Sequence, residues 1–236
     1  MLELLRNKRI LIVVAHPDDE LLGLGAVMNK LITEYNVTAH VVILGEGITS
    51  RSDVRDTHKW KNELTAHKNN ILAAQKEIGY HTISLYDFPD NRFDTVALLD
   101  IVKAIEKEKM NFKPEVIFTH HGGDVNIDHK RTFEAVITAC RPLESEKVKT
   151  ILCFETPSST EWQANTYPIP FLPNLFFSVS EKNMKAKVKA MECYEYEKRK
   201  YPHPRSPEGL MIVAQKWGIV TGCKYAEAFV LIRSIN

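Results

Sequence analysis

Ile10-Leu11-Ile12-Val13-Val14, followed directly by Ala15-His16-Pro17-Asp18-Asp19-Glu20, is the stretch that decides the fold. Its first five residues form a continuous and mostly β-branched apolar run, which is typical of a central parallel strand buried on both faces. Four ionisable residues then arrive within five positions, ahead of a helix that we expect over 21–35. Because open α/β sheets bind their ligands at the carboxyl ends of strands, we expect a ligand site at this turn.

The turn itself carries the residue types of a metal site. His16 and Asp19 are an imidazole and a carboxylate three residues apart, a spacing that lets both reach one cation while Pro17 restrains the backbone between them. The adjacent carboxylates of Asp18 and Asp19 repel each other unless a cation or a hydrogen-bond donor is present. The alternative interpretation is a helix N-terminus with acidic residues, which the helix dipole favours without any ligand.

A second polar cluster lies far downstream. The apolar run Val116 to Thr119 leads into His120-His121-Gly122-Gly123-Asp124-Val125-Asn126-Ile127-Asp128-His129, and a helix is expected over 132–140. The order of strand, polar loop and helix is therefore repeated, which places His129 at the same edge of the sheet as His16. Two ligands that are close in sequence and a third that is distant are the pattern of a catalytic zinc site with an open position for water.

The two clusters resemble the motifs of a known family, the PIG-L/LmbE-like zinc-dependent N-deacetylases. Residues 15–20 match the first family motif without change, and Asp128-His129 match the end of the second. The resemblance covers residues 9–140 well and continues more weakly through 202–206 and 226–229.

The resemblance implies Zn²⁺ as the cofactor and an acetyl-removing hydrolysis as the reaction. It implies His16, Asp19 and His129 as the zinc ligands, and Asp18 as the general base that takes a proton from water. The expected substrate is a small-molecule N-acetylated sugar of the N-acetylglucosamine type. Asp128 is expected either to orient a ligand or to cap the helix that His129 opens.

One position departs from the family pattern. Many members carry a histidine three positions before the last ligand, where it protonates the leaving amine or stabilises the oxyanion, and this chain has Asn126 there. An amide can donate a hydrogen bond but cannot deliver a proton, so Asn126 is a candidate for the oxyanion role alone. The candidates for the proton donor are Asp18, His120, His121 and Asp124.

The rest of the chain alternates between expected strands and helices. This alternation, up to Cys140, supports one domain over 1–236 with an α/β fold: a Rossmann-like, mostly parallel sheet with helices on both faces. The other expected strands cover 37–44, 82–85, 150–154 and 174–179, and the other expected helices cover 60–78, 96–109, 181–199 and 208–217.

Gly23 and Gly25 lie at the start of the first expected helix. A dinucleotide-binding loop would place its glycines directly after the strand, whereas these follow the acidic turn and a third glycine is absent. Close packing of the helix against the sheet explains both glycines better.

Several side chains in the loops are candidates for substrate contacts. The arginines of the loop over 48–58 suit an anionic group, and the hydroxyl-rich loop over 155–162, with its aromatic residue, suits a sugar. Each loop also has a plain explanation, because solvated charges, turn-forming residues and prolines are common in connectors. The candidates are Arg51, Arg55, Asp90, Arg92, Trp162 and His203.

Composition excludes several classes of protein. A formal net charge of +1 and a sequence pI near 7.7 give no pull toward nucleic acid or an anionic membrane. The four cysteines are widely spaced without a Cys-x-x-Cys pair, which indicates free thiols. The N-terminus lacks a signal-peptide pattern, and prolines interrupt the uncharged stretch over 162–180. We therefore expect a cytoplasmic enzyme that does not insert into membranes and whose oligomeric state, homo-oligomer or monomer, is open.

Two other functions are open on the sequence alone. A mononuclear iron(II) enzyme also uses two histidines and a carboxylate, although its usual His-x-Asp/Glu spacing and β scaffold differ from the pattern here. A non-catalytic Rossmann-type protein that binds a small molecule would not need Asp18 beside Asp19. Metal content distinguishes these functions, because they require zinc with hydrolysis, iron with oxygen uptake, or no metal.

Overall fold

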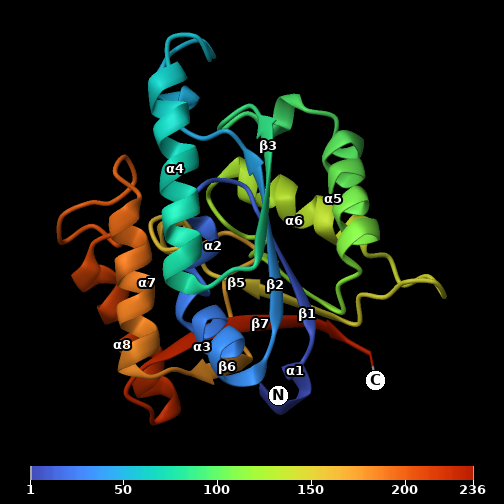
Figure 1. The fold of residues 1–236 in the computed structure, drawn as a ribbon, viewed down its shortest axis with the longest axis vertical. Coiled ribbons are helices and arrows are strands. Elements are labelled where there is room, and N and C mark those ends of the chain that lie inside the picture. The colour runs from blue at the N-terminus through green and yellow to red at the C-terminus, as the bar shows by residue number, and fades with distance from the viewer. Residues whose placement is uncertain (1, 236) are drawn as a thin grey trace.

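A seven-stranded sheet runs through the centre of the computed structural model, which describes residues 2–235 (Figure 1). Its strand order is β3-β2-β1-β4-β5-β7-β6; the neighbours from β3 to β5 pair in parallel, whereas β7 is antiparallel to β5 and β6. The mostly parallel sheet predicted from the sequence is therefore confirmed. The strands are β1 (Arg9–Val14), β2 (Thr38–Gly45), β3 (Thr82–Phe88), β4 (Val116–His120), β5 (Thr150–Phe154), β6 (Leu175–Ser178) and β7 (Ala226–Ser234).

Helices cover both faces of this sheet, as the sequence predicted (Figure 1). Helices α3, α4, α7 and α8 share one large apolar core with one face, and α5 and α6 share a second core with the other. Within residues 2–235, no helix combines the length and the apolar character that a membrane crossing requires. The helices are α1 (Leu2–Leu5), α2 (Asp19–Leu22), α3 (Gly25–Tyr35), α4 (Lys61–Ile78), α5 (Leu98–Phe112), α6 (Ile127–Ala139), α7 (Glu181–Cys193) and α8 (Pro207–Thr221).

Strand β1 lies in the middle of the sheet, and every residue from Ile10 to Val14 is fully buried. It pairs in parallel with β2 on one side and with β4 on the other. The side chains of Ile10, Ile12 and Val14 belong to one core, and the two residues between them belong to the other. An uninterrupted apolar run is needed here because both faces of the strand are covered.

The helix expected over 21–35 is interrupted, and the structure divides it into α2 and α3. Gly23 lies at the break, against the end of β5. A Cβ atom at Gly23 would lie 2.3 Å from the Phe154 ring and 2.5 Å from the carbonyl oxygen of Glu155. The chain can pass this point only without a side chain, which is the close packing that the glycine indicated.

Helix α6 begins at Ile127, earlier than the expected start at residue 132. The side chain of Asn126 accepts a hydrogen bond from the Asp128 N–H at 2.8 Å and so caps the helix. His129 therefore lies within the first turn of the helix, where the backbone fixes its direction.

Helix α7 is shorter than the sequence pattern predicts, because it ends at Cys193 instead of residue 199. Tyr194 is buried and leaves the helical conformation, and its hydroxyl donates a hydrogen bond to the Glu20 carboxylate at 2.6 Å. The turn over 195–197 that follows brings Glu197 to the cleft beside the first motif.

Strand β7 has no counterpart among the expected strands. It lies between β5 and β6, and its buried Glu227 interrupts the apolar pattern that marks a covered strand. The Glu227 carboxylate accepts the N–H of Val27 at 2.7 Å and pairs with the Lys187 amine at 2.7 Å. This buried pair connects α3 and α7 to the sheet.

Gly23→Ala is expected to lower the free energy of unfolding by about 1–3 kcal/mol, because the added methyl group meets backbone at the end of β5. Urea unfolding followed by circular dichroism measures the change. Gly25→Ala is the matched control: a Cβ atom there meets only side-chain atoms, at 3.1 Å or more, and should cost less. Equal stability of the two variants would contradict the close approach at Gly23.

Candidate metal centre

Three side chains with metal-binding atoms meet at the carboxyl end of the sheet. His16 follows β1, Asp19 begins α2, and His129 lies in the first turn of α6. One potential ligand atom from each lies within 4.8 Å of the other two. All three side chains are withdrawn from solvent, and His16 is the most exposed at 13%. The structure thus brings together the three residues that the sequence suggested as ligands.

The Asp19 carboxylate is the negative centre of this group. Its Oδ2 lies 3.4 Å from Nδ1 of His16 and 3.3 Å from Nε2 of His129. Its Oδ1 and the Nε2 of His129 are buried, and neither has a hydrogen-bond partner within residues 2–235. Buried polar atoms without partners are unfavourable, and a shared cation would satisfy both. Two imidazoles and a carboxylate are also a donor set that a zinc ion accepts.

Two further carboxylates fix the orientation of the imidazoles. Oδ2 of Asp128 lies 2.8 Å from Nε2 of His16, and Oδ1 of Asp124 lies 3.2 Å from Nδ1 of His129. Each carboxylate accepts the proton of one ring nitrogen, which leaves the other nitrogen with a free lone pair. The free nitrogens are Nδ1 of His16 and Nε2 of His129, the two that lie beside Asp19.

Asp128 and Asp124 are themselves held by hydrogen-bond donors. Asp128 accepts the backbone N–H groups of Asn91 and Phe93 at 2.6 and 2.8 Å, and Asp124 accepts two hydroxyl groups from the loop after β5. Burial favours a raised pKa for Asp124, but the adjacent His129 and these hydroxyls hold that pKa well below its usual range. Asp124 therefore stays anionic and fixes the His129 ring.

His120 lies beside the metal-binding atoms but has no lone pair to offer. Its Nε2 accepts the N–H of Ala15 at 3.0 Å, and its Nδ1 lies 3.0 Å from the Thr156 hydroxyl. Burial, together with the neighbouring His129, lowers the pKa of His120 to about 4. His120 is therefore neutral at physiological pH and lacks the proton that a general acid would deliver.

The other two alternatives for the proton donor face away from the first motif. Nε2 of His121 donates to the carbonyl oxygen of Ile169 at 3.0 Å, and its ring packs edge-on against Phe171. The Asp124 carboxylate is used by the hydroxyl groups and by His129. Of the four candidates, Asp18 is the one that lines the cleft described below.

A second group of potential ligands consists of His16, Asp90 and Asp128. Its carboxylates already have partners: Asp90 accepts the Ser50 N–H at 3.1 Å, and Asp128 accepts two backbone N–H groups. The direct contact between Asp128 and His16 would also have to break. The set with Asp19 and His129 is therefore the better fit for a cation.

A small cleft, which we call the polar cleft, opens beside His16 and Asp18. Its cavity volume of about 110 Å³ is room for about four water molecules. Most of its lining is polar, and two of the candidates for substrate contact, Arg51 and Asp90, belong to it. The polar lining also includes Ser50, Asn91, Asn126, Glu197 and Arg205.

The remaining candidates for substrate contact lie outside the polar cleft. Arg55 forms a bidentate ion pair with Glu46, with both distances 2.8 Å. Arg92 donates to a backbone carbonyl of the loop before α4. Trp162 is 56% exposed and packs edge-on against His203, with ring centres 5.6 Å apart. The structure does not bring these four side chains to the metal-binding atoms.

Arg205 is a residue of the polar cleft that was not among the candidates from the sequence. Its Nη1 lies 2.9 Å from Oδ2 of Asp18 and 2.8 Å from Oε2 of Glu197, and its Nε donates to the Ser158 hydroxyl at 2.8 Å. The available signal was its place in the proline-rich loop over 201–207, which the family resemblance reaches only weakly. A lone arginine there has the appearance of a solvated charge.

Asp18 has an unusual environment for a carboxylate. Burial raises the pKa of Asp18 well above its usual value, and Arg205 opposes this rise. Oδ2 lies 2.9 Å from Nη1 of Arg205, and apart from this ion pair it has no hydrogen-bond partner within residues 2–235. Asp18 lines the polar cleft, where its carboxylate would meet a bound molecule.

Strained backbone is concentrated around the polar cleft. Asp18, Ile48, Asn91 and Ser158 have φ angles of +93°, +66°, +54° and +74°. Such left-handed conformations cost residues other than glycine about 1–3 kcal/mol and persist where the surroundings enforce them, often at functional sites. Three of these residues line the cleft, and Ser158 holds Arg205. The fold thus fixes the direction of the Asp18 side chain.

Comparison with known proteins places the chain among relatives of similar length. The model of the PIG-L family, described as GlcNAc-PI de-N-acetylase, matches residues 11–140. The Escherichia coli K12 protein YaiS, named an uncharacterized deacetylase, is 28% identical over 195 residues, which are 80% of this chain and 92% of YaiS.

Two solved structures share the fold. The N,N'-diacetylchitobiose deacetylase from Pyrococcus horikoshii has a TM-score of 0.71 at 16% identity, over 96% of this chain and 84% of that one. GalB, the 4-carboxy-2-hydroxymuconate hydratase from Pseudomonas putida, has a TM-score of 0.75 at 19% identity, over 97% of this chain and 98% of that one.

Asp124→Asn is expected to weaken zinc binding by about 10- to 100-fold, because an amide cannot hold the Nδ1–H of His129 with a full negative charge. Competition against a chromophoric chelator at constant pH measures the affinity. Asp100→Asn, an exposed acid on α5, is the matched control and should bind zinc like the unmodified protein. Unchanged affinity of the Asp124 variant would show that this carboxylate does not orient a ligand.

Arg205→Gln is expected to lower the free energy of unfolding by about 3–5 kcal/mol, because it leaves the buried Asp18 carboxylate without its cationic partner and removes one of the two arginines that pair closely with Glu197. Chemical denaturation measures the loss. In the control variant Arg199→Gln, the replaced arginine is 40% exposed and 3.9 Å from the same Glu197, so a loss below about 1 kcal/mol is expected. Similar losses of unfolding free energy in both variants would show that the ion pair between Arg205 and Asp18 does not stabilise the protein.

Proposed function

The chain belongs to the PIG-L family of GlcNAc-PI de-N-acetylases, and from this premise we propose that it is a zinc-dependent deacetylase. The reaction is hydrolysis of the acetamide of an N-acetylglucosamine-type sugar or sugar conjugate, which yields acetate and a free amine. The proposal is supported by the approach of ligand atoms from His16, Asp19 and His129 to within 4.8 Å of one another, with the buried Asp18 carboxylate next to them in the chain.

His16 through Nδ1, His129 through Nε2 and Asp19 would hold the zinc ion. Their second contacts, to Asp128 and Asp124, set the two tautomers that this requires. When bound there, Zn²⁺ supplies Lewis-acid polarisation of a carbonyl oxygen and a lowered pKa for water. Iron(II) accepts a similar donor set, and elemental analysis of the purified protein distinguishes the two metals.

Asp18 is the group that moves protons. Its Oδ2 is fixed by Arg205 at 2.9 Å, and its Oδ1 accepts a proton from the attacking water as the water oxygen bonds to the acetamide carbon. The same carboxyl group returns that proton to the nitrogen as the carbon–nitrogen bond breaks. This cycle needs no second acid, which agrees with the absence of a histidine at position 126.

Asn126 is suited to meet the charge that develops on the carbonyl oxygen. Its Oδ1 is engaged in the cap of α6, and its Nδ2 donates one hydrogen to Asn91 at 2.9 Å. These two contacts fix the amide, so that the second N–H of Nδ2 remains for a substrate oxygen. A donor held rigidly before the reaction stabilises charge without reorganising.

The polar lining of the cleft supports a sugar as substrate. Ser50, Arg51 and Asp90 offer hydrogen-bond donors and acceptors of the kinds that hydroxyl groups pair with. The Pyrococcus horikoshii enzyme is named for an acetylated amino sugar, and YaiS is named a deacetylase. GalB, however, has the same fold and is named a hydratase, so the proposal rests on the residues rather than on the fold.

The zinc-loaded protein is expected to release free amine from N-acetylglucosamine conjugates, and a chelator should abolish the release. Asp18→Asn should lower kcat by about 10²- to 10⁴-fold, because the proton acceptor is lost. The amine is quantified by fluorescamine, and bound zinc is measured in the same samples. Asp100→Asn again serves as the control. An Asp18→Asn variant with normal zinc content and normal kcat would exclude Asp18 as the base.

A further inference from the structure

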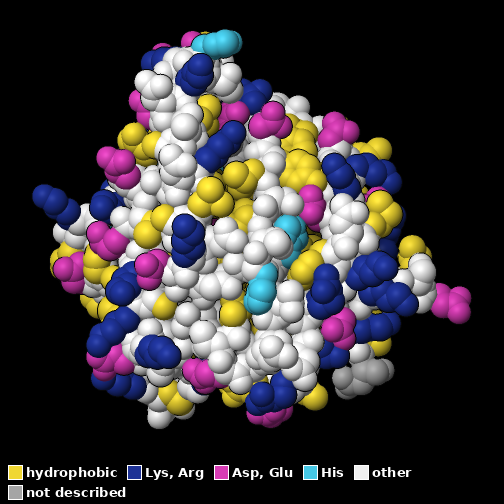
Figure 2. All heavy atoms as spheres, in the orientation of Figure 1, with side chains coloured by type: hydrophobic (Ala, Val, Ile, Leu, Met, Phe, Trp, Pro, Cys, Tyr) yellow, Lys and Arg dark blue, Asp and Glu magenta, His cyan; other side chains and the backbone are white. Residues whose placement is uncertain are grey.

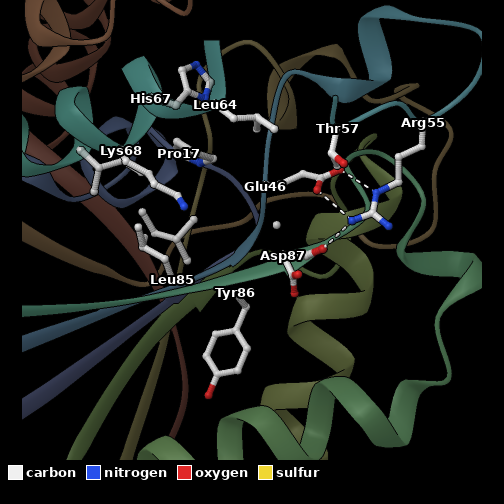
Figure 3. Close-up of a pocket in the computed structure, with 13 residues that line it drawn as sticks. Pro17, Glu46, Arg55, Thr57, Leu64, His67, Lys68, Leu85, Tyr86 and Asp87 are labelled. Atoms are coloured by element: carbon white, nitrogen blue, oxygen red, sulfur yellow. Dashed lines mark hydrogen bonds and ion pairs between the residues drawn. The ribbon is translucent and has the colours of Figure 1, made fainter. Parts of the chain in front are cut away.

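A groove with a cavity volume of about 640 Å³ lies between helix α4 and the edge strand β3 (Figure 3). Leu64 and Ile71 reach it from α4, Ile43 from β2 and Leu85 from β3. Figure 2 shows hydrophobic side chains exposed on this face of the molecule, between α4 and β3. We call this feature the α4–β3 groove.

The lining of the groove is mixed: Leu64, Ile71 and Leu85 form an apolar wall, and Lys68 and Asp87 are among its polar residues. Leu85 is 41% exposed, and Figure 3 shows Leu64, Pro17 and Leu85 on one side of the cavity with the Arg55–Glu46 pair on the other. The guanidinium of Arg55 is already bound by both carboxylate oxygens of Glu46 and by a backbone carbonyl. The charges of Arg55 and Glu46 are therefore paired with each other and need no ligand. A cavity of this size with an exposed apolar wall is typical of a binding site.

Two residues belong to both the groove and the polar cleft, namely Pro17 and His67. Pro17 lies between His16 and Asp18, so the groove begins directly behind the first motif. His67 is 2% exposed, and neither ring nitrogen has a hydrogen-bond partner within residues 2–235; its Nε2 is 3.5 Å from the Glu197 carboxylate. A buried imidazole in this state is unfavourable, and a polar group of a ligand that extends past it would satisfy it.

Gly47 keeps the boundary between the two cavities thin. Its φ is +68°, and a Cβ atom there would lie 3.1 Å from Cδ of Pro17 and 3.4 Å from Nδ1 of His67. A side chain at this position would therefore fill the space between Pro17 and His67.

The sizes of the two cavities indicate how a substrate is divided between them. The polar cleft, at about 110 Å³, has room for an acetamide group beside Asp18 but not for a whole sugar conjugate. The adjoining groove is several times larger, and Leu64, Ile71 and Leu85 give it an apolar wall on which an alkyl or aryl group can pack. On the basis of the proposed function, we propose that the α4–β3 groove is the subsite for the aglycone, and that the preferred substrate carries an apolar alkyl or aryl aglycone.

A direct test uses phenyl β-glucoside, which carries the aglycone but no acetamide and therefore needs no turnover. Calorimetric titration should show saturable binding to the unmodified protein and at least tenfold weaker binding to Leu85→Asp. Leu72→Asp is the matched control, since Leu72 is 50% exposed on helix α4 and does not line the groove. Absence of binding, or equal binding by the two variants, would overturn the proposal.

Circular dichroism and thermal unfolding establish that each variant is folded. Leu85→Ser serves as a second variant if Leu85→Asp does not fold, because it removes the same apolar surface without adding a charge. A folded Leu85→Ser protein is expected to bind phenyl β-glucoside more weakly than Leu72→Asp does. Unchanged binding by Leu85→Ser would contradict an aglycone in this groove.

Kinetics distinguish the aglycone subsite from the proposed reaction. The KM of the phenyl glycoside of N-acetylglucosamine should be at least tenfold below that of the methyl glycoside, and Leu85→Asp should remove this difference whereas Leu72→Asp should keep it. Equal KM values for the two glycosides in the unmodified protein would overturn the subsite and leave the deacetylase intact. Leu85-dependent binding of phenyl glucoside without release of amine from any glycoside would overturn the deacetylase and leave the groove as a binding site.

Discussion

The burial of the Asp19 carboxylate among His16, His120 and His129 is the constraint on which the rest of the site depends. Burial alone would raise the pKa of Asp19, and the adjacent His129 and His120 instead hold it well below its usual value. A carboxylate so placed stays anionic and determines which nitrogen of each ring must face it. The buried acids at positions 124 and 128 take the opposite nitrogens, and the Ala15 N–H occupies His120. The hydrogen bonds that orient these rings therefore form one connected network from the first motif to the loop after β5.

The sequence predicts those parts of the molecule that depend on local pattern. The apolar run over 10–14, the turn after it and the candidate ligands in the turns after β1 and β4 can be found from the sequence, because strand burial and ligand spacing act over few residues. The break at Gly23, the strand β7 and the contact between Asp18 and Arg205 are not legible. Each depends on segments that are distant in sequence, and in β7 a buried Glu227 hides the apolar pattern.

The fold fixes a frame within which different chemistry is possible, and the acid–base groups decide which reaction occurs. In the proposed reaction the proton is moved by Asp18, a carboxylate on a residue with a strained positive φ angle that pairs with Arg205. The backbone strain and the buried charges oppose stability, and the two apolar cores on either face of the sheet offset them. Asn126 has two roles, because its side chain caps helix α6 and also lines the polar cleft.

The most direct test of the metal centre is the anomalous diffraction of zinc-loaded crystals, recorded above and below the zinc absorption edge. The account predicts one strong site within about 2.0–2.2 Å of Nδ1 of His16, Nε2 of His129 and a carboxylate oxygen of Asp19. It also predicts that His120 keeps its hydrogen bond to Ala15 and does not contact the ion. A zinc ion between His16, Asp90 and Asp128, or one bound by His120, would contradict it.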